Sequence, residues 1–220
     1  MSGRFPRSVV IDFEYEVEGG EYNLKPGDLP VPLCMVAYLL DENLQHVQTI
    51  TLWREQLLVA KVPPFSVDTN TAVIAYSAWA EMTCFHVLHW QFPVHVLDLH
   101  TAYLAVSNIL LPHSPDEERR KPRKRLADAC RAYGIEGWEH IDKQTIAEDI
   151  GQGRWQKYGR VIVLHYCEED VRRTVELLRA MLRGYLGRPV IDVFRVLHWS
   201  NYSAKAVALA SLPVVPKIER

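Results

Sequence analysis

Hydrophobic residues in the first half of the chain fall into short runs separated by turn-forming segments. The run from Val9 to Val17, VVIDFEYEV, is β-branched or aromatic at most apolar positions, which is typical of a strand. The run from Leu33 to Leu40 is apolar throughout, and Val47 to Trp53 alternates apolar with polar residues. These runs predict three successive strands that pair as an antiparallel meander.

Strands and helices alternate further along the chain. The strand expected at Thr71–Tyr76 precedes a helical pattern at Trp79–Trp90, and the strand expected at Val94–Leu97 precedes one at His100–Leu110. Residues 57–70 contain a Pro-Pro pair and predict a helix or a loop. Alternation of this kind favours parallel pairing through crossover connections. We therefore expect an α/β protein with a mixed five-stranded sheet, three antiparallel strands followed by parallel ones, flanked by helices.

The remainder of the chain predicts three more helices. They are expected at Leu126–Tyr133, which ends before a glycine, at Asp142–Ile150, which begins with its own Asp cap, and at Gly159–Arg183. The stretch 111–125 contains three prolines and the sequence EERRKPRKR. It is consistent both with a solvated loop and with a basic arm that contacts phosphates.

Composition limits the class of protein without identifying a partner. The chain has 220 residues, 48% hydrophobic and 24% charged, and a formal net charge of -2, as expected of one sizeable soluble core. Four scattered cysteines form no C-x-x-C pair, so we interpret them as reduced core thiols of a cytoplasmic protein. No apolar run has the length of a membrane span, so we expect no membrane partner. The small net charge does not exclude nucleic acid, because acidic and basic surfaces can cancel.

Five residues suggest chemistry. Asp12 and Glu14 alternate along a strand, so both carboxylates point to one face, where desolvation favours a cation between them. An ordinary solvated strand end is the alternative. Glu81 falls in the first turn of a helix that follows a strand, where α/β sheets build sites, although a helix dipole also favours an acid there. Tyr166 and Asp170 lie one helical turn apart on a common face.

At these residues the chain resembles the 3′-to-5′ exonucleases of the DEDD superfamily, tyrosine subclass (DEDDy). The resemblance is greatest to the proofreading domain of family A DNA polymerases, of the bacterial DNA polymerase I and bacteriophage types. Asp12 and Glu14 match the first motif, Asp-x-Glu, and YCEED, which ends at Asp170, matches the third motif, Tyr-x-x-x-Asp. The second motif of the family is His-Asn-x-x-(Phe/Tyr)-Asp. Here it reads YSAWAE, so that Glu81 replaces the family's Asp and Ser77 its Asn.

The resemblance implies a ribonuclease H-like fold and a metal-dependent, proofreading-type exonuclease. Such an enzyme hydrolyses phosphodiester bonds at the 3′ end of single-stranded DNA and releases nucleoside 5′-monophosphates, with a polymerase domain or subunit as a possible partner. The exonuclease domain is expected over residues 1–185, and residues 186–220 resemble a helical tail at the junction to a polymerase domain. Two alternatives stay open: a catalytically weak nucleic-acid-binding or structural module of a polymerase, and an RNA-directed exonuclease of the ribonuclease D type.

Phosphodiester hydrolysis of this kind uses two Mg²⁺ or Mn²⁺ ions about 3.5 to 4 Å apart, held by hard oxygen ligands. We expect Asp12 to bridge the ions, with Glu14 and Asp170 on the ion that activates water. Glu81 is expected to act on the second ion, through water, and the Tyr166 hydroxyl to orient the nucleophile. Contacts with the substrate are expected from Phe13, Tyr15, Ser77, Trp79 and Phe85.

Overall fold

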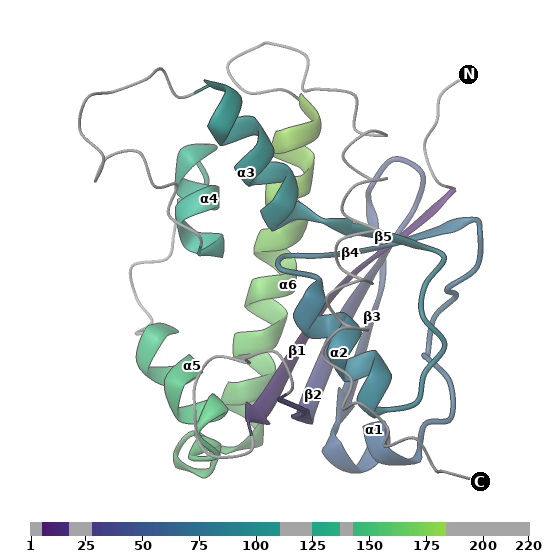
Figure 1. Cartoon of the computed structure of the whole chain (residues 1–220), viewed down its shortest axis with the longest axis vertical. Coiled ribbons are helices and arrows are strands. Elements are labelled where there is room, and N and C mark those ends of the chain that lie inside the picture. Colours follow the sequence, from purple (N-terminus) through teal and green to yellow (C-terminus); the bar gives the residue numbers. More distant parts are fainter. Residues whose placement is uncertain (1–5, 18–27, 111–124, 137–142, 184–220) are drawn as a thin grey trace, which may run out of the picture.

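The structure is a computed structural model and describes residues 6–17, 28–110, 125–136 and 143–183. Five strands form one sheet in the order β3-β2-β1-β4-β5 (Figure 1). Their bounds are β1 (Arg7–Val17), β2 (Pro30–Leu40), β3 (His46–Trp53), β4 (Thr71–Ala75) and β5 (His95–Asp98). β1 pairs antiparallel with β2, as does β2 with β3, whereas β1 with β4 and β4 with β5 are parallel. This strand order, with one antiparallel and one parallel half, is compatible with the ribonuclease H-like fold that the resemblance implies. The expected mixed sheet is thus confirmed.

Helices cover both faces of this sheet. They are α1 (Arg54–Val59), α2 (Trp79–Val87), α3 (Leu99–Leu110), α4 (Leu126–Ala132), α5 (Lys143–Gly151) and α6 (Gly159–Arg183), with a short 3-10 helix, η2 (Trp155–Lys157). The long helix α6 packs on one face with α3 and α4 beside it, and α1 and α2 lie on the other (Figure 1). The segment expected at 57–70 to be a helix or a loop is both: α1 begins earlier, at Arg54, and ends at Val59, and residues 60–70 form the connection to β4. Its start is stabilised because the Trp53 N–H donates to the side chain of Gln56 at 3.0 Å.

Successive residues of β1 enter two different cores, as strand alternation requires. Val10 is completely buried and packs in the core beneath α6, whereas Ile11 and Phe13 are buried in the core beneath α2. Asp12 and Glu14 follow Val10 in the alternation and therefore share its side of the sheet. The strand is thereby fixed from both faces, which holds the two acids in register.

Two irregularities of the sheet occur beside these acids. The β1–β2 register shifts between Glu14 and Tyr15, and the adjacent residues Leu33 and Cys34 of β2 both enter the core beneath α6. Bulges of this kind re-aim side chains and are common next to active sites. In addition, β1 pairs with β4 only as far as Val10. From Asp12 onward, the β4 side of β1 has no strand neighbour and is open to the start of α2.

Some expectations lie outside the described residues. These are the basic stretch at 111–124, the cap proposed at Asp142 and the tail at 186–220. Among the described helices, none combines the length and the apolar character needed to cross a membrane. All four cysteines are free and buried, which confirms their placement in the core.

Candidate metal centre

Asp12 lies at the centre of a group of acids. It is partly buried on β1, and Glu14, one pleat further along, is only 9% exposed. A side-chain hydrogen bond joins the two carboxyl groups. Burial first, and then the negative charge of Asp12, raise the pKa of Glu14 well above its usual value, and Asp170 of α6 adds to this effect. Acids from β1 and α6 therefore share one electrostatic environment.

Glu81 joins this group from the opposite helix layer. It is in the first turn of α2, as expected, and is 3% exposed. Burial, and after it the charge of Asp12, raise the pKa of Glu81 well above its usual value. Its Oε2 atom is buried and has no hydrogen-bond partner within the described part of the chain. Asp12 thus acts electrostatically on Glu81 as well as on Glu14, and Asp170 acts on Glu14. Of the four sequence-predicted acids, Asp12 and Glu14 belong to the group of described residues whose possible ligand atoms lie within 4.8 Å of one another.

The turn between β4 and α2 determines where Glu81 lies. Ser77 in this turn has a φ of 64°, a left-handed conformation that costs energy for a residue with a Cβ. Its N–H donates to Asp98 Oδ1 at 3.1 Å, and the same oxygen accepts from the N–H of His100 at 2.9 Å. Asp98 therefore caps α3 and at the same time fastens the turn that presents Glu81.

Helix α6 supplies a further acid, Asp170, whose charge acts on Glu14. Tyr166 is 8% exposed and Asp170, one turn later, is partly buried. Between them, Cys167 is completely buried, and its Sγ donates to the backbone carbonyl oxygen of Asp12 at 3.4 Å. Sequence reasoning missed Cys167, although its i, i+3 relation to Asp170 places both on one helix face.

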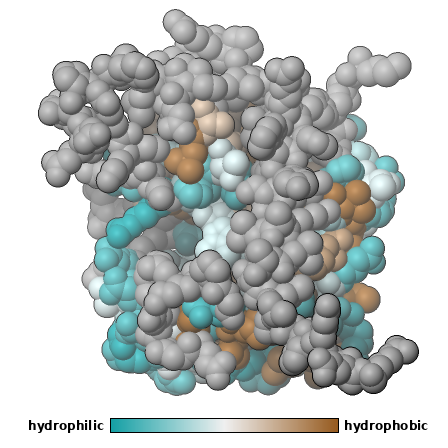
Figure 2. Space-filling view, in the orientation of Figure 1, coloured by the Kyte–Doolittle hydropathy of each residue, from teal (hydrophilic) through white to brown (hydrophobic). Residues whose placement is uncertain are grey.

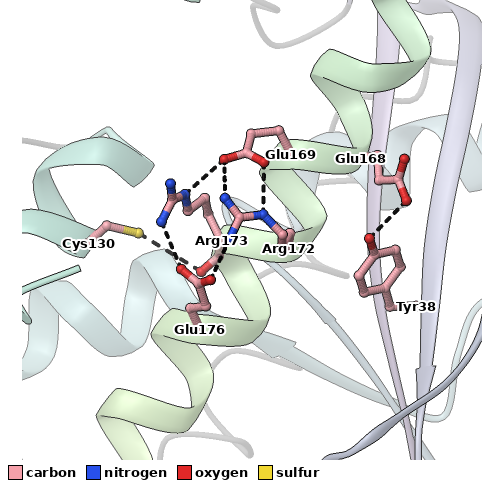
Figure 3. A network of polar contacts seen from close by, with 7 residues as sticks. All are labelled: Tyr38, Cys130, Glu168, Glu169, Arg172, Arg173 and Glu176. Atoms are coloured by element: carbon pink, nitrogen blue, oxygen red, sulfur yellow. Dashed lines mark hydrogen bonds and ion pairs between the residues drawn. The ribbon is translucent and has the colours of Figure 1, made fainter. Parts of the chain in front are cut away.

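An ion-pair network runs along α6 (Figure 3). Arg172 and Arg173 each pair with both Glu169 and Glu176. Arg173 is only 6% exposed, and its carbonyl oxygen accepts a weak hydrogen bond from the Cys130 thiol of α4 at 3.9 Å. The Tyr38 hydroxyl of β2 donates to Glu168 at 2.9 Å, so contacts with both α4 and β2 join the part of α6 around Asp170 to the rest of the fold.

The residues expected to contact a substrate fall into two groups. Phe13 and Phe85 are 3% and 0% exposed, and their rings pack edge to face with centroids 6.2 Å apart. They leave no surface for a substrate, so the structure gives them a packing role in the core instead. Tyr15 and Trp79 are partly exposed and pack together in a small cluster beside the first turn of α2, and Ser77 is partly exposed in the preceding turn.

The donor set fits divalent cations. Four carboxylates offer the hard oxygen ligands that Mg²⁺ and Mn²⁺ prefer. Within the described residues, neither Glu14 nor Glu81 forms an ion pair with a lysine or arginine, and the charges that act on both raise their pKa values. Two buried acids without a compensating charge, one of them with an unpartnered oxygen, are costly unless a cation binds there.

Polar side chains gather around α5. Figure 2 shows hydrophilic side chains at the lower left, where Figure 1 places this helix. Asp149 of α5 forms ion pairs with Arg154 and Lys157 at 2.6 and 3.2 Å, and Tyr158 donates to it at 2.7 Å. The Tyr158 hydrogen bond, followed by those from Arg154 and Lys157, lowers the pKa of Asp149 to about 2. This cluster fixes the loop between α5 and α6.

Comparison with known proteins gives a likeness of fold only. No protein-family model and no curated protein sequence matches the chain. Exonuclease I of E. coli in complex with a dT13 oligonucleotide is 14% identical, with a TM-score of 0.47, covering 96% of this chain and 46% of that one. An ExoI/SSB-Ct complex is 12% identical, with a TM-score of 0.45, and the match covers 88% of this chain and 43% of that one. A moderately thermophilic exonuclease I from Methylocaldum szegediense is 14% identical, with a TM-score of 0.43, and the match covers 83% of this chain and 41% of that one.

The chain spans less than half the length of these exonuclease I structures. Their identity to this chain, 12 to 14%, is too low to transfer residue roles. The resemblance to polymerase I-type proofreading domains therefore stays a prediction from the three sequence motifs.

Proposed function

We propose that this protein is a divalent-metal-dependent 3′-to-5′ exonuclease that removes nucleotides from the 3′ end of single-stranded DNA. One observation carries the proposal: Glu14 of β1 and Glu81 of α2 are both buried, both feel the negative charge of Asp12, and neither forms an ion pair with a lysine or arginine among the described residues. A buried acidic group of this size is unfavourable for stability, which argues that it is retained for catalysis.

The position of each acid relative to Asp12 suggests its role. Bound Mg²⁺ or Mn²⁺ ions would activate a water and neutralise the charge on the phosphoryl group and on the leaving 3′ oxygen. Asp12 acts electrostatically on both Glu14 and Glu81, so it is placed to serve both ion positions. Glu14 and Asp170 lie on the α6 side and would hold the first ion, whereas Glu81 would hold the second.

Tyr166 is proposed to orient the attacking water. It lies one turn before Asp170 on α6 and is buried except for 8% of its surface. Replacing Tyr166 with phenylalanine removes the hydroxyl and leaves the four acids in place. We expect a roughly 10- to 100-fold lower single-turnover rate with unchanged metal affinity, because the variant loses only the positioning of the water, and the loss should therefore not exceed the low end of the roughly 10²- to 10⁴-fold that a general acid or base contributes.

His165 provides the matched comparison for Tyr166. It precedes Tyr166 on α6, is exposed, and is the residue type most often used as a base near neutral pH. His165→Ala should retain most of the single-turnover rate if the tyrosine hydroxyl orients the water. A large loss in His165→Ala together with a normal rate in Tyr166→Phe would reassign the role to the histidine.

The substrate strand is proposed to stack on Tyr15 and Trp79. Both are partly exposed aromatic side chains beside the turn that carries Glu81. Stacking of bases on aromatic rings contributes about 1 to 3 kcal/mol per base and tolerates any sequence, as a general exonuclease requires.

Association with a polymerase belongs to this proposal on the sequence motifs alone. The four buried free thiols suit a reducing compartment such as the cytoplasm.

The proposed function is tested by cleavage of 3′-labelled oligonucleotides in Mg²⁺, followed under single-turnover conditions. Release of labelled nucleoside 5′-monophosphate from single-stranded DNA, stopped by a chelator, is the expected result. Faster release from an RNA oligonucleotide of the same sequence would favour the ribonuclease D-type alternative. Binding of the oligonucleotide without any release would contradict the proposal and favour a binding module.

A further inference from the structure

A thiol lies among the acids of the metal centre. One possible ligand atom from each of Asp12, Glu14 and Cys167 lies within 4.8 Å of the other two. Cys167 is completely buried on α6, and its thiol donates to the backbone carbonyl oxygen of Asp12 at 3.4 Å. The centre therefore contains a soft sulfur donor that Mg²⁺ does not use.

We propose that the protein has a second metal-binding mode, in which Asp12, Glu14 and the Cys167 thiolate hold one Zn²⁺-like cation that competes with the catalytic ions. Zn²⁺ and Cd²⁺ accept both thiolate and carboxylate ligands. Zn–S bonds near 2.3 Å and Zn–O bonds near 2.1 Å in tetrahedral geometry separate sulfur from oxygen by roughly 3.6 Å. The ligand atoms of the three residues lie at most 4.8 Å apart, so an approach of about 1 Å between sulfur and oxygen would bring them to the separation that a bound Zn²⁺ requires. The thiol proton leaves to solvent as the ion binds.

A second observation indicates that this place accepts a cation. The Glu81 side chain is 3% exposed, its Oε2 atom has no hydrogen-bond partner in the described part of the chain, and it experiences the charge of Asp12. The inference concerns metal binding and does not require the protein to cleave nucleic acid.

Titration of the whole, metal-free protein with Cd²⁺ alone tests this inference. Coordination by a thiolate produces an ultraviolet sulfur-to-cadmium charge-transfer band. We expect the band in the wild type at one equivalent, its bleaching by excess Mg²⁺, and at least a tenfold weaker Cd²⁺ affinity without the band in Cys167→Ser. Cys130→Ser is the matched control, because Cys130 is also buried and free but bonds to the carbonyl oxygen of Arg173 on α6.

A second variant covers the case in which Cys167→Ser does not fold. Asp12→Asn keeps the thiol and removes one carboxylate ligand, so it should also weaken Cd²⁺ binding by at least tenfold. An absent band in the wild type, or an undiminished band in Cys167→Ser, would overturn the inference. Mg²⁺-dependent cleavage without a cadmium band refutes this inference alone, whereas a band without cleavage refutes the proposed nuclease alone.

Discussion

Replacing Asp12 with asparagine is expected to lower the single-turnover rate of 3′ nucleotide release by roughly three orders of magnitude. The amide keeps the shape of the side chain but removes the charge that acts on both Glu14 and Glu81. Each ion position would lose its shared ligand. The loss should appear in the rate at saturating Mg²⁺, because the remaining acids cannot restore a bridging carboxylate.

A charge-matched variant controls for the Asp12 experiment. Asp128 of α4 pairs with Arg131 at 3.0 Å; its own side chain is 15% exposed and that of the arginine 65%, so Asp128→Asn removes the same charge from a partly buried ion pair. Asp128 is not among the acids assigned to the metal centre, so the cleavage rate should stay within about twofold of the wild type. Circular dichroism and thermal unfolding establish that both variants fold. A folded Asp12→Asn protein with the wild-type rate would refute the assignment of this centre.

Replacing Glu81 with glutamine should have opposite effects on activity and stability. Loss of one ligand to the second ion is expected to lower the cleavage rate by about 10²-fold. In contrast, the metal-free protein should become more stable at pH 8, because a neutral amide avoids burying a carboxylate beside Asp12. Active sites commonly contain groups, such as a buried carboxylate, that lower the stability of the fold but are needed for activity.

The stabilising effect of Glu81→Gln should increase with pH. Because the folded protein raises the pKa of Glu81 above the usual 4.5, it keeps the proton to higher pH than the unfolded chain does. The free energy of unfolding of the wild type is thus least reduced below pH 4.5. It falls by up to about 1.4 kcal/mol per pH unit as the pH rises toward the raised pKa. Glutamine cannot ionise, so the free-energy advantage of the variant should be larger at pH 8 than at pH 5.

Urea unfolding of the metal-free protein at pH 5 and pH 8 measures this difference. Asp149, with its pKa lowered to about 2, stays ionised between pH 5 and pH 8, so it does not make the free energy of unfolding depend on pH in this range. Glu55→Gln on the exposed side of α1 is the control and should change the free energy of unfolding by less than about 0.5 kcal/mol at either pH. A Glu81→Gln variant less stable than the wild type at pH 8 would show that Glu81 is not an uncompensated buried charge.

The sequence was sufficient to predict the fold because the local patterns were unambiguous. Alternation along β1 is visible in the order Val10, Ile11, Asp12 and Phe13, and the structure places these residues on opposite faces as the pattern requires. That Glu81 and Asp170 belong to one site stays a prediction from motif order. No local pattern contains the reason why Asp12 acts on Glu81, which is that the described pairing of β1 with β4 ends at Val10 and leaves Asp12 open to α2.

Features that depend on tertiary contacts could not be predicted in the same way. From the sequence alone, an aromatic residue such as Phe85 can be either a core residue or a platform on which bases stack. Its packing against Phe13, Phe65 and Trp90 shows that it is a core residue. Cys167 looks like any buried thiol in a helix until β1 is placed beside it. The register shift after Glu14 likewise depends on how β2 pairs with β1.

The most direct test of the central claim is a crystal of the protein soaked in Mn²⁺ and examined for anomalous scattering. Our account predicts two Mn²⁺ peaks that share Asp12, one also contacting Glu14 and Asp170 and the other on the Glu81 side. Absence of anomalous density at Asp12 in a well-diffracting, Mn²⁺-soaked crystal would contradict it.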